Sequence, residues 1–102
     1  MKCLTLVIHE SAKQDLIDHL LSRDDISGFT LCAAEGHSRR TSGNPFETTR
    51  DVVLGYVPRV RVDVITSDAN LPNIRDQICH CDSCVTGRGV WWITEVQDWG
   101  TL

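Results

Sequence analysis

The sequence lacks two features that would assign it to large classes of protein: it has no long hydrophobic run and no surplus of positive charge. No apolar stretch among its 102 residues approaches the roughly 20 residues that a membrane-spanning helix requires. Its 10 basic side chains are outnumbered by 14 acidic ones, which gives a net charge of −4. Nonspecific nucleic-acid binding needs a basic footprint, so we expect no nucleic-acid partner. The missing apolar run leads us to expect no membrane span.

Signals for export are also missing. The opening residues, MKCLTLVIHE, contain one lysine and then alternate, without the apolar core or small-residue cleavage site of a secretory signal. The five cysteines form an odd count, which argues against the fully paired disulfide framework of a secreted domain. We therefore expect a cytoplasmic protein, with residues 1–102 forming a single domain around one core.

Arrangements typical of enzymes are absent as well. No nucleophile lies at a motif spacing from a base, and the sequence shows no carboxylate pair or metal-binding triad at such a spacing. Glu35 and Glu47 flank the longest polar segment without evident partners. We therefore expect a protein that is not an enzyme.

The periodic segments of the chain, in contrast, favour one fold. Apolar side chains recur at strand or helix spacing, in the order strand, helix, strand, strand, helix, strand, over residues 2–9, 11–21, 29–34, 57–66, 70–78 and 90–96. That is the order of the α+β, ferredoxin-like βαββαβ fold, in which two helices cover one face of a four-stranded antiparallel sheet. Since the other face would remain open, we expect an oligomer in which sheets face each other.

Individual residues refine these elements. Ser11 is the expected N-cap of the first helix, and Asn70 or Asp68 is the expected N-cap of the second. Cys3 and Cys32 lie inside expected strands, where a cysteine most simply acts as a small buried hydrophobic residue.

The last strand begins after Gly87 and Gly89, which we expect to break the second helix. It contains Trp91 and Trp92, and neighbouring strand residues point to opposite faces of a sheet. We therefore expect one tryptophan in the core and the other at a subunit interface.

The longest polar segment of the chain separates the second and third strands. It begins at Gly36, and its roughly fifteen residues without apolar periodicity greatly exceed the two to five of an ordinary hairpin loop. Long loops inside compact domains are commonly functional. We therefore expect this loop to carry the function.

Three blocks of sequence, taken together on this fold, resemble the PII signal-transduction superfamily. Residues 28–40, GFTLCAAEGHSRR, are similar to that family's second strand and the start of its long T-loop. Residues 56–64, YVPRVRVDV, resemble the start of its third strand, and residues 86–96, TGRGVWWITEV, resemble its B-loop and fourth strand. The resemblance implies a homotrimer with a T-loop at about 37–53 and a B-loop at about 84–90.

The resemblance also implies a ligand, namely an adenine nucleotide (ADP, AMP or ATP) bound in clefts between subunits. The implied nucleotide-binding residues are Gly28, Phe29, Thr30, Gly36, Arg39, Arg59, Gly87, Arg88, Gly89 and Val90, and the implied contacts of an anion or effector such as bicarbonate are His37 and Arg40. Arginine presents a fork of donors that suits phosphate, and glycine lets backbone N–H groups approach an anion closely.

In the PII family, the T-loop signals to a partner protein. The resemblance implies that the partner of this chain is a membrane transporter or a metabolic enzyme, and one setting that it implies is bicarbonate and inorganic-carbon metabolism. Two departures mark a divergent member. Arg40 replaces the family's glutamine that helps to hold magnesium and 2-oxoglutarate, and Val90 replaces its B-loop lysine. The chain therefore resembles a PII-like regulator and not a nitrogen regulator.

A cysteine-rich hexapeptide, CHCDSC at 79–84, supports an alternative function. Its thiols and imidazole, from Cys79, His80, Cys81 and Cys84, could ligate zinc or a softer metal. A continuous helix would place only His80 and Cys84 on one face, and there is no second ligand pair at zinc-finger spacing. A reversible disulfide and inert thiols remain open, and the alternative function is a metal-binding PII-like module associated with metal efflux.

Overall fold

The computed structural model describes residues 1–37, 55–80 and 89–102. Most of the expected T-loop and B-loop lie outside the described residues, as do these residues implied in ligand or metal binding: Arg39, Arg40, Cys81, Cys84, Gly87 and Arg88. None of the helices in the described ranges is long and apolar enough to cross a membrane.

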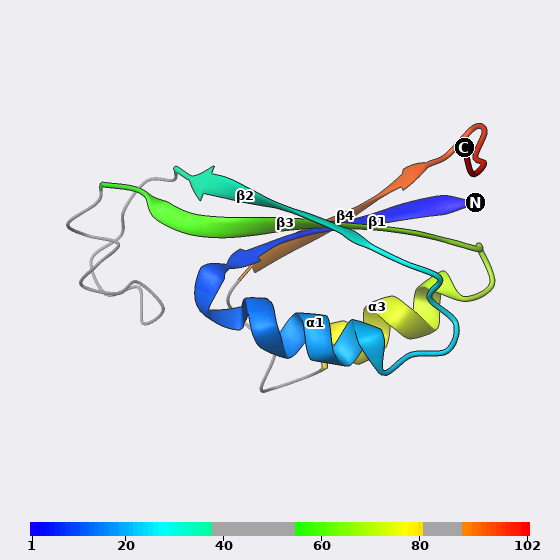
Figure 1. Cartoon of the computed structure of the whole chain (residues 1–102), viewed down its shortest axis with the longest axis horizontal. Coiled ribbons are helices and arrows are strands. Elements are labelled where there is room, and N and C mark those ends of the chain that lie inside the picture. Colours follow the sequence, from blue (N-terminus) through cyan, green and yellow to red (C-terminus); the bar gives the residue numbers. More distant parts are fainter. Residues whose placement is uncertain (38–54, 81–88) are drawn as a thin grey trace.

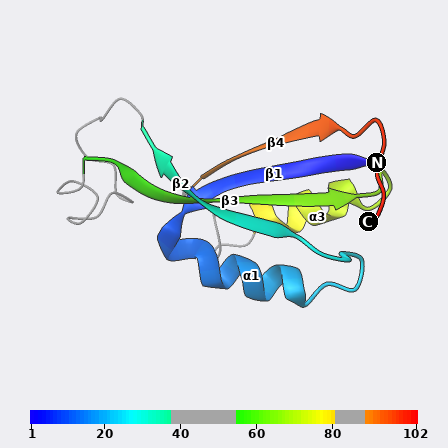
Figure 2. The same cartoon turned by 45° about the horizontal axis from the view of Figure 1, so that its top comes forward.

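The chain adopts the ferredoxin-like βαββαβ fold (Figure 1), which confirms the fold class expected from the sequence. The elements are β1 (Lys2–His9), a short 3-10 helix η1 (Glu10–Ala12), α1 (Lys13–Leu21), β2 (Thr30–Gly36), β3 (Val57–Thr66), α3 (Leu71–Cys79) and β4 (Gly89–Glu95). The strands form one antiparallel sheet in the order β2-β3-β1-β4. Both helices cover the same face of this sheet (Figures 1 and 2).

The core lies between the sheet and the two helices. Alternate residues of the two central strands supply its sheet side, because Leu4 pairs with Val64, Leu6 with Val62 and Ile8 with Val60. The helices contribute Ala12, Leu16, Leu20, Leu71, Ile74 and Ile78, all buried. Apolar side chains that recur every two residues in the strands thus pack against apolar side chains that recur about every 3.6 residues in the helices.

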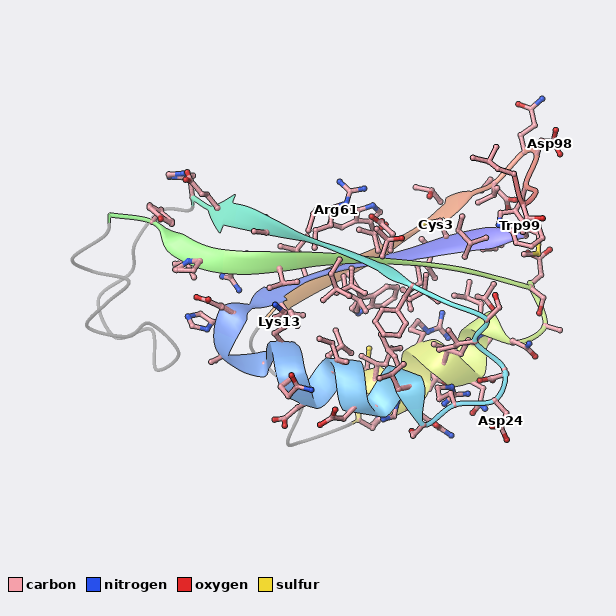
Figure 3. The ribbon with its side chains drawn as sticks, viewed as in Figure 1. Cys3, Lys13, Asp24, Arg61, Asp98 and Trp99 are labelled. Carbon is pink, nitrogen blue, oxygen red and sulfur yellow. The ribbon has the colours of Figure 1, made fainter. Side chains whose placement is uncertain are left out.

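The opposite face of the sheet is not covered by any described element. Arg61 projects from this face, away from the helices (Figure 3), and its guanidinium lies 5.6 Å from the centroid of the Trp92 ring. Arg61 also donates to Asp63, which accepts a 2.7 Å hydrogen bond from the buried Thr5 hydroxyl. We call this uncovered side, which carries Thr5, Arg61, Asp63, Val90 and Trp92, the open face.

The N-cap expected at Ser11 is wrong. The chain first forms η1, whose N-cap is His9, and α1 begins only at Lys13. The reason lies in the imidazole of His9, because its Nδ1 accepts the backbone N–H of Ser11 at 3.0 Å. His9 thereby caps the N–H of Ser11, which lies inside the first helical turn and not at its N-cap position.

Both tryptophans of β4 are exposed, so the expectation that one lies in the core is wrong. Trp91 is 45% exposed and Trp92 39%. Trp91 shares the helix-facing side with Leu6, its partner in β1, but β4 is an edge strand. Its ring therefore lies beside α3 and not beneath it, 5.7 Å from the guanidinium of Arg75.

Two further expectations differ from the structure. The second helix ends at Cys79, with His80 as its C-cap, so Gly87 and Gly89 are not the residues that terminate it. Cys32 is exposed because β2 is the other edge strand and Cys32 lies on its open-face side, opposite Arg61.

Candidate functional site

Several of the sequence-predicted residues meet at one end of the sheet. β2 ends there at Gly36 and β4 begins at Gly89, while Arg59 sits between them in β3. The register makes this explicit, because Arg59 pairs with Ala34 on one side and with His9 on the other, and Gly89 pairs with Ile8. Antiparallel pairing therefore gathers residues that are far apart in the sequence.

Arg59 is held close to Gly36. A Cβ atom added to Gly36 would lie 2.9 Å from both Cγ and Nε of Arg59, and 3.3 Å from the carbonyl oxygen of Val57. The absence of a side chain at Gly36 thus leaves the space in which the arginine stem lies. This packing places a guanidinium beside the strand end from which the long loop departs.

Gly89 is packed even more tightly at the start of β4. An added Cβ would overlap the carbonyl oxygen of Val7 and would come within 3.0 Å of the Cα of Ile8. A residue with a side chain would have to push β4 away from β1. Val90, the next residue, is 61% exposed and points to the open face, opposite Val7.

His37 lies at the same end with two neighbours. Its Nε2 is 3.2 Å from a carboxylate oxygen of Glu35, and its ring centroid is 6.1 Å from that of Tyr56. Glu35 therefore has a partner, contrary to the expectation from sequence. The three side chains bring a carboxylate, an imidazole and a phenol to the base of the loop.

Gly28, Phe29 and Thr30 lie at the other end of the sheet. Thr30 starts β2 and pairs with Asp63, whereas Gly36 ends that strand about 20 Å away at 3.3 Å per residue. Phe29 packs against the core, Gly28 and Thr30 are exposed, and a Cβ on Gly28 would meet nothing within 4 Å. Within one chain, these three residues do not join Arg59, Gly36 and Gly89 in a common site.

Part of the cysteine-rich hexapeptide is described. Cys79 is a half-buried free thiol at the end of α3, and His80 is exposed. The Nδ1 atom of His80 lies 2.6 Å from the carbonyl oxygen of Asp76. In the described ranges, no group of three or more His, Cys, Asp or Glu side chains could hold a metal ion.

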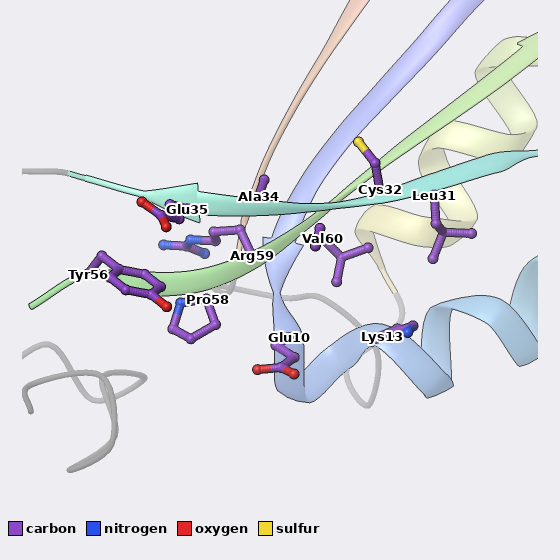
Figure 4. Close-up of a pocket in the computed structure, with 11 residues that line it drawn as sticks. Glu10, Lys13, Leu31, Cys32, Ala34, Glu35, Tyr56, Pro58, Arg59 and Val60 are labelled. Atoms are coloured by element: carbon purple, nitrogen blue, oxygen red, sulfur yellow. The ribbon is translucent and has the colours of Figure 1, made fainter. Parts of the chain in front are cut away.

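A pocket opens between the sheet and the start of α1 (Figure 4). It has a volume of about 510 Å³ and lies under β2 and β3, on the side that faces the helices. Its apolar lining comes from Leu31, Ala33, Pro58 and Val60, and its polar lining from Glu10, Lys13, Glu35, Tyr56 and Arg59. Arg59 thus lines this pocket as well as lying beside Gly36.

Sequence reasoning singled out neither Lys13 nor Tyr56. Lys13 falls in the expected first helix and Tyr56 in the block that resembles the start of the PII third strand, and neither was expected to bind a ligand. A sequence signal existed for one of them, since Lys13 is one of two lysines in the chain. The pocket itself depends on how β2 and β3 pack above η1, which no local pattern encodes.

Away from this end of the sheet, the carboxyl group of Asp63 and the imidazole of His19 have shifted pKa values. Burial pushes the pKa of Asp63 upward, but hydrogen bonds from Thr5 and Arg61 and the charge of Arg61 outweigh it, so that this pKa lies below its usual value. Burial, and secondarily the charge of Arg23, lower the pKa of His19. Both groups belong to the framework and not to the candidate site.

Comparisons with known proteins agree with this architecture. A crystal structure of a DUF3240 family protein from Shewanella baltica OS155, at 2.40 Å resolution, superposes with a TM-score of 0.76. It is 21% identical, and the match covers 99% of this chain and 94% of that one, so the likeness shows the fold. No curated protein matches the chain. A family model described as "Protein of unknown function (DUF3240)" matches residues 1–102, and the chain therefore belongs to the DUF3240 family.

Proposed function

We propose that this protein is a nonenzymatic, PII-like regulator that binds an adenine nucleotide in clefts between the subunits of a homotrimer. Its loop at about 37–53 would carry the signal to a transporter or enzyme, with bicarbonate as a candidate effector. The observation that carries the proposal is the gathering of Gly36, Arg59 and Gly89 at one end of the sheet. An arginine suits a phosphate group, and glycine lets backbone N–H groups approach an anion closely.

The position of Gly28, Phe29 and Thr30 supports a cleft shared by two subunits. These residues lie at the far end of β2 from Gly36, so a single chain cannot close both halves around one small ligand. A neighbouring subunit can supply the second half. The intersubunit cleft implied by the sequence resemblance has this requirement.

The open face supports self-association. Trp92 and Val90 are 39% and 61% exposed there, and monomers rarely leave a large apolar patch exposed to water. The ion pair of Arg61 with Asp63 lies beside them, at 3.2 Å. A trimer in which these faces meet would bury the two apolar side chains and would place one chain's β2 beside its neighbour.

The proposal is tested by calorimetric titration of the reduced, metal-free protein with ATP, ADP and AMP, each with and without bicarbonate. We expect saturable binding of about one nucleotide per chain, since three equivalent clefts in a trimer give that ratio. A bicarbonate-dependent change in affinity would identify the effector. If none of the nucleotides binds, the proposal is wrong.

A second candidate, a metal-binding PII-like module associated with metal efflux, is favoured by one observation at His80. Because a carbonyl oxygen lies 2.6 Å from Nδ1, that nitrogen donates the hydrogen bond, and Nε2 is left as the atom with a free lone pair. Metal-binding histidines are commonly oriented in this way. Zinc titration of the wild type and of the variants His80→Ala and Cys79→Ser tests it, with loss of stoichiometric zinc expected in both variants.

A further inference from the structure

The pocket under β2 and β3 has the size and lining of a small-molecule site. Its volume of about 510 Å³ falls within the range of roughly 300–1,000 Å³ that is usual for ligand pockets. Leu31 and Val60 point down into it from the two strands (Figure 4). With Pro58 and Ala33 they form an apolar wall against which a hydrocarbon part of a ligand can be buried.

The charges around the pocket are not equally available. Glu35 is already paired with His37 at 3.2 Å, and Glu10 and Arg59 have interactions of their own. Lys13 differs, because among residues 1–37, 55–80 and 89–102 its ammonium group has no ion-pair or hydrogen-bond partner. It extends from the start of α1 toward the sheet (Figure 3), and it is one of the residues that line the pocket.

An apolar wall with one uncommitted ammonium group has a definite chemical preference. A purely apolar molecule would leave Lys13 without a counter-charge, and a small inorganic anion would leave the wall wet. We propose that this pocket binds a small organic acid, whose carboxylate pairs with Lys13 and whose hydrocarbon part lies against Leu31, Pro58 and Val60. Arg59 borders both this pocket and the proposed nucleotide cleft, but the proposal does not depend on nucleotide binding.

Three probes separate the two parts of this recognition. Hexanoate carries both the carboxylate and the chain, hexanamide has the same chain without the charge, and acetate has the charge without most of the chain. Each is titrated into the nucleotide-free, isotope-labelled protein, and backbone amide shifts are followed by NMR. We expect saturable shifts with hexanoate at Leu31, Ala33 and Val60, and binding at least about fivefold weaker for hexanamide and for acetate.

The two lysines of the chain provide a matched control. Lys2 is paired with Glu95 at the other end of the sheet, so Lys2→Gln removes the same charge away from the pocket. We expect Lys13→Gln to weaken hexanoate binding about five- to tenfold, Lys13→Arg to retain most of it, and Lys2→Gln to leave it unchanged. Lys13 is exposed, so its substitution leaves the core intact.

Three results would overturn the proposal. Shifts that do not saturate, or that fall on the open face around Trp92, would place the probe elsewhere. Equal losses in Lys13→Gln and Lys2→Gln would show a response to net charge only. Equal affinity for hexanoate and hexanamide would show an apolar cavity without selection for acids. Nucleotide binding, measured separately, does not affect any of these readings.

Discussion

The side chain of Arg59 lies across Gly36, so closely that a Cβ atom at the glycine would be 2.9 Å from the Cγ and Nε atoms of the arginine. The two residues are neighbours only because β2 and β3 pair in antiparallel register, with Ala34 opposite Arg59 and Gly36 opposite Val57. Gly36 therefore acts as a positioning residue for the guanidinium, and the proposed phosphate site depends on a residue that has no side chain.

The first prediction concerns this pair. Gly36→Ala should displace the arginine side chain and weaken ATP binding about five- to tenfold, because a misdirected guanidinium loses its paired hydrogen bonds to phosphate. Gly100→Ala is the control, since a Cβ there meets nothing within 4 Å. Fluorescence titration with a labelled nucleotide measures both variants. Equal affinities would contradict the positioning role.

The second prediction concerns Gly89. Gly89→Ala should lower the free energy of unfolding by about 1–3 kcal/mol, because the new methyl group would overlap the carbonyl of Val7 and force β4 from β1. Urea unfolding followed by tryptophan fluorescence gives the value. If Gly89→Ala is as stable as Gly100→Ala, the two strands are not packed as closely as the structure shows.

The third prediction concerns the open face. Trp92→Ala should weaken subunit association by about 2 kcal/mol or more, since a central interface tryptophan commonly contributes that much. Trp99→Ala is the control, because Trp99 lies in the C-terminal tail, has an equally large ring and is 50% exposed. This variant should leave the molecular mass of the assembly that of a trimer. Sedimentation equilibrium distinguishes trimer from monomer. A monomeric wild type would contradict the proposed assembly at once.

The fourth prediction concerns His19, whose Nε2 is buried without a hydrogen-bond partner in the described part of the chain. Burial first, and the nearby charge of Arg23 second, lower its pKa below 6.5 in the folded protein. The unfolded chain therefore binds the proton more readily, so stability should fall as the pH drops below about 6.5. Urea unfolding between pH 5 and 8 measures this slope, which His19→Gln should reduce; an unchanged slope would assign it to another group.

Local periodicity was sufficient to predict most of the framework. The expected bounds of β1 and β3 agree with Lys2–His9 and Val57–Thr66, because alternating apolar residues of central strands report their burial directly. The stripe of Leu71, Ile74 and Ile78 likewise identified the buried side of α3. In these elements, the local pattern and the tertiary environment agree.

Expectations failed where burial depends on the order of strands in the sheet. Trp91 and Cys32 have apolar or small side chains within strands, yet both are exposed because β4 and β2 are edges. Strand order is a nonlocal property, and no periodicity within a strand encodes it. The same reason explains why the approach of Arg59 to Gly36 and the pocket near Lys13 required the structure.

The most direct test of the central claim is complementation between two variants that each damage one half of the proposed cleft. Arg59→Glu alters one half and Thr30→Glu the other, so each homotrimer should fail to bind ATP. After subunit exchange in an equal mixture, about a quarter of the clefts should combine two intact halves and recover binding. Recovery at that level is the predicted result. No recovery in trimers proven to be mixed would show that the two ends of the sheet do not share one site.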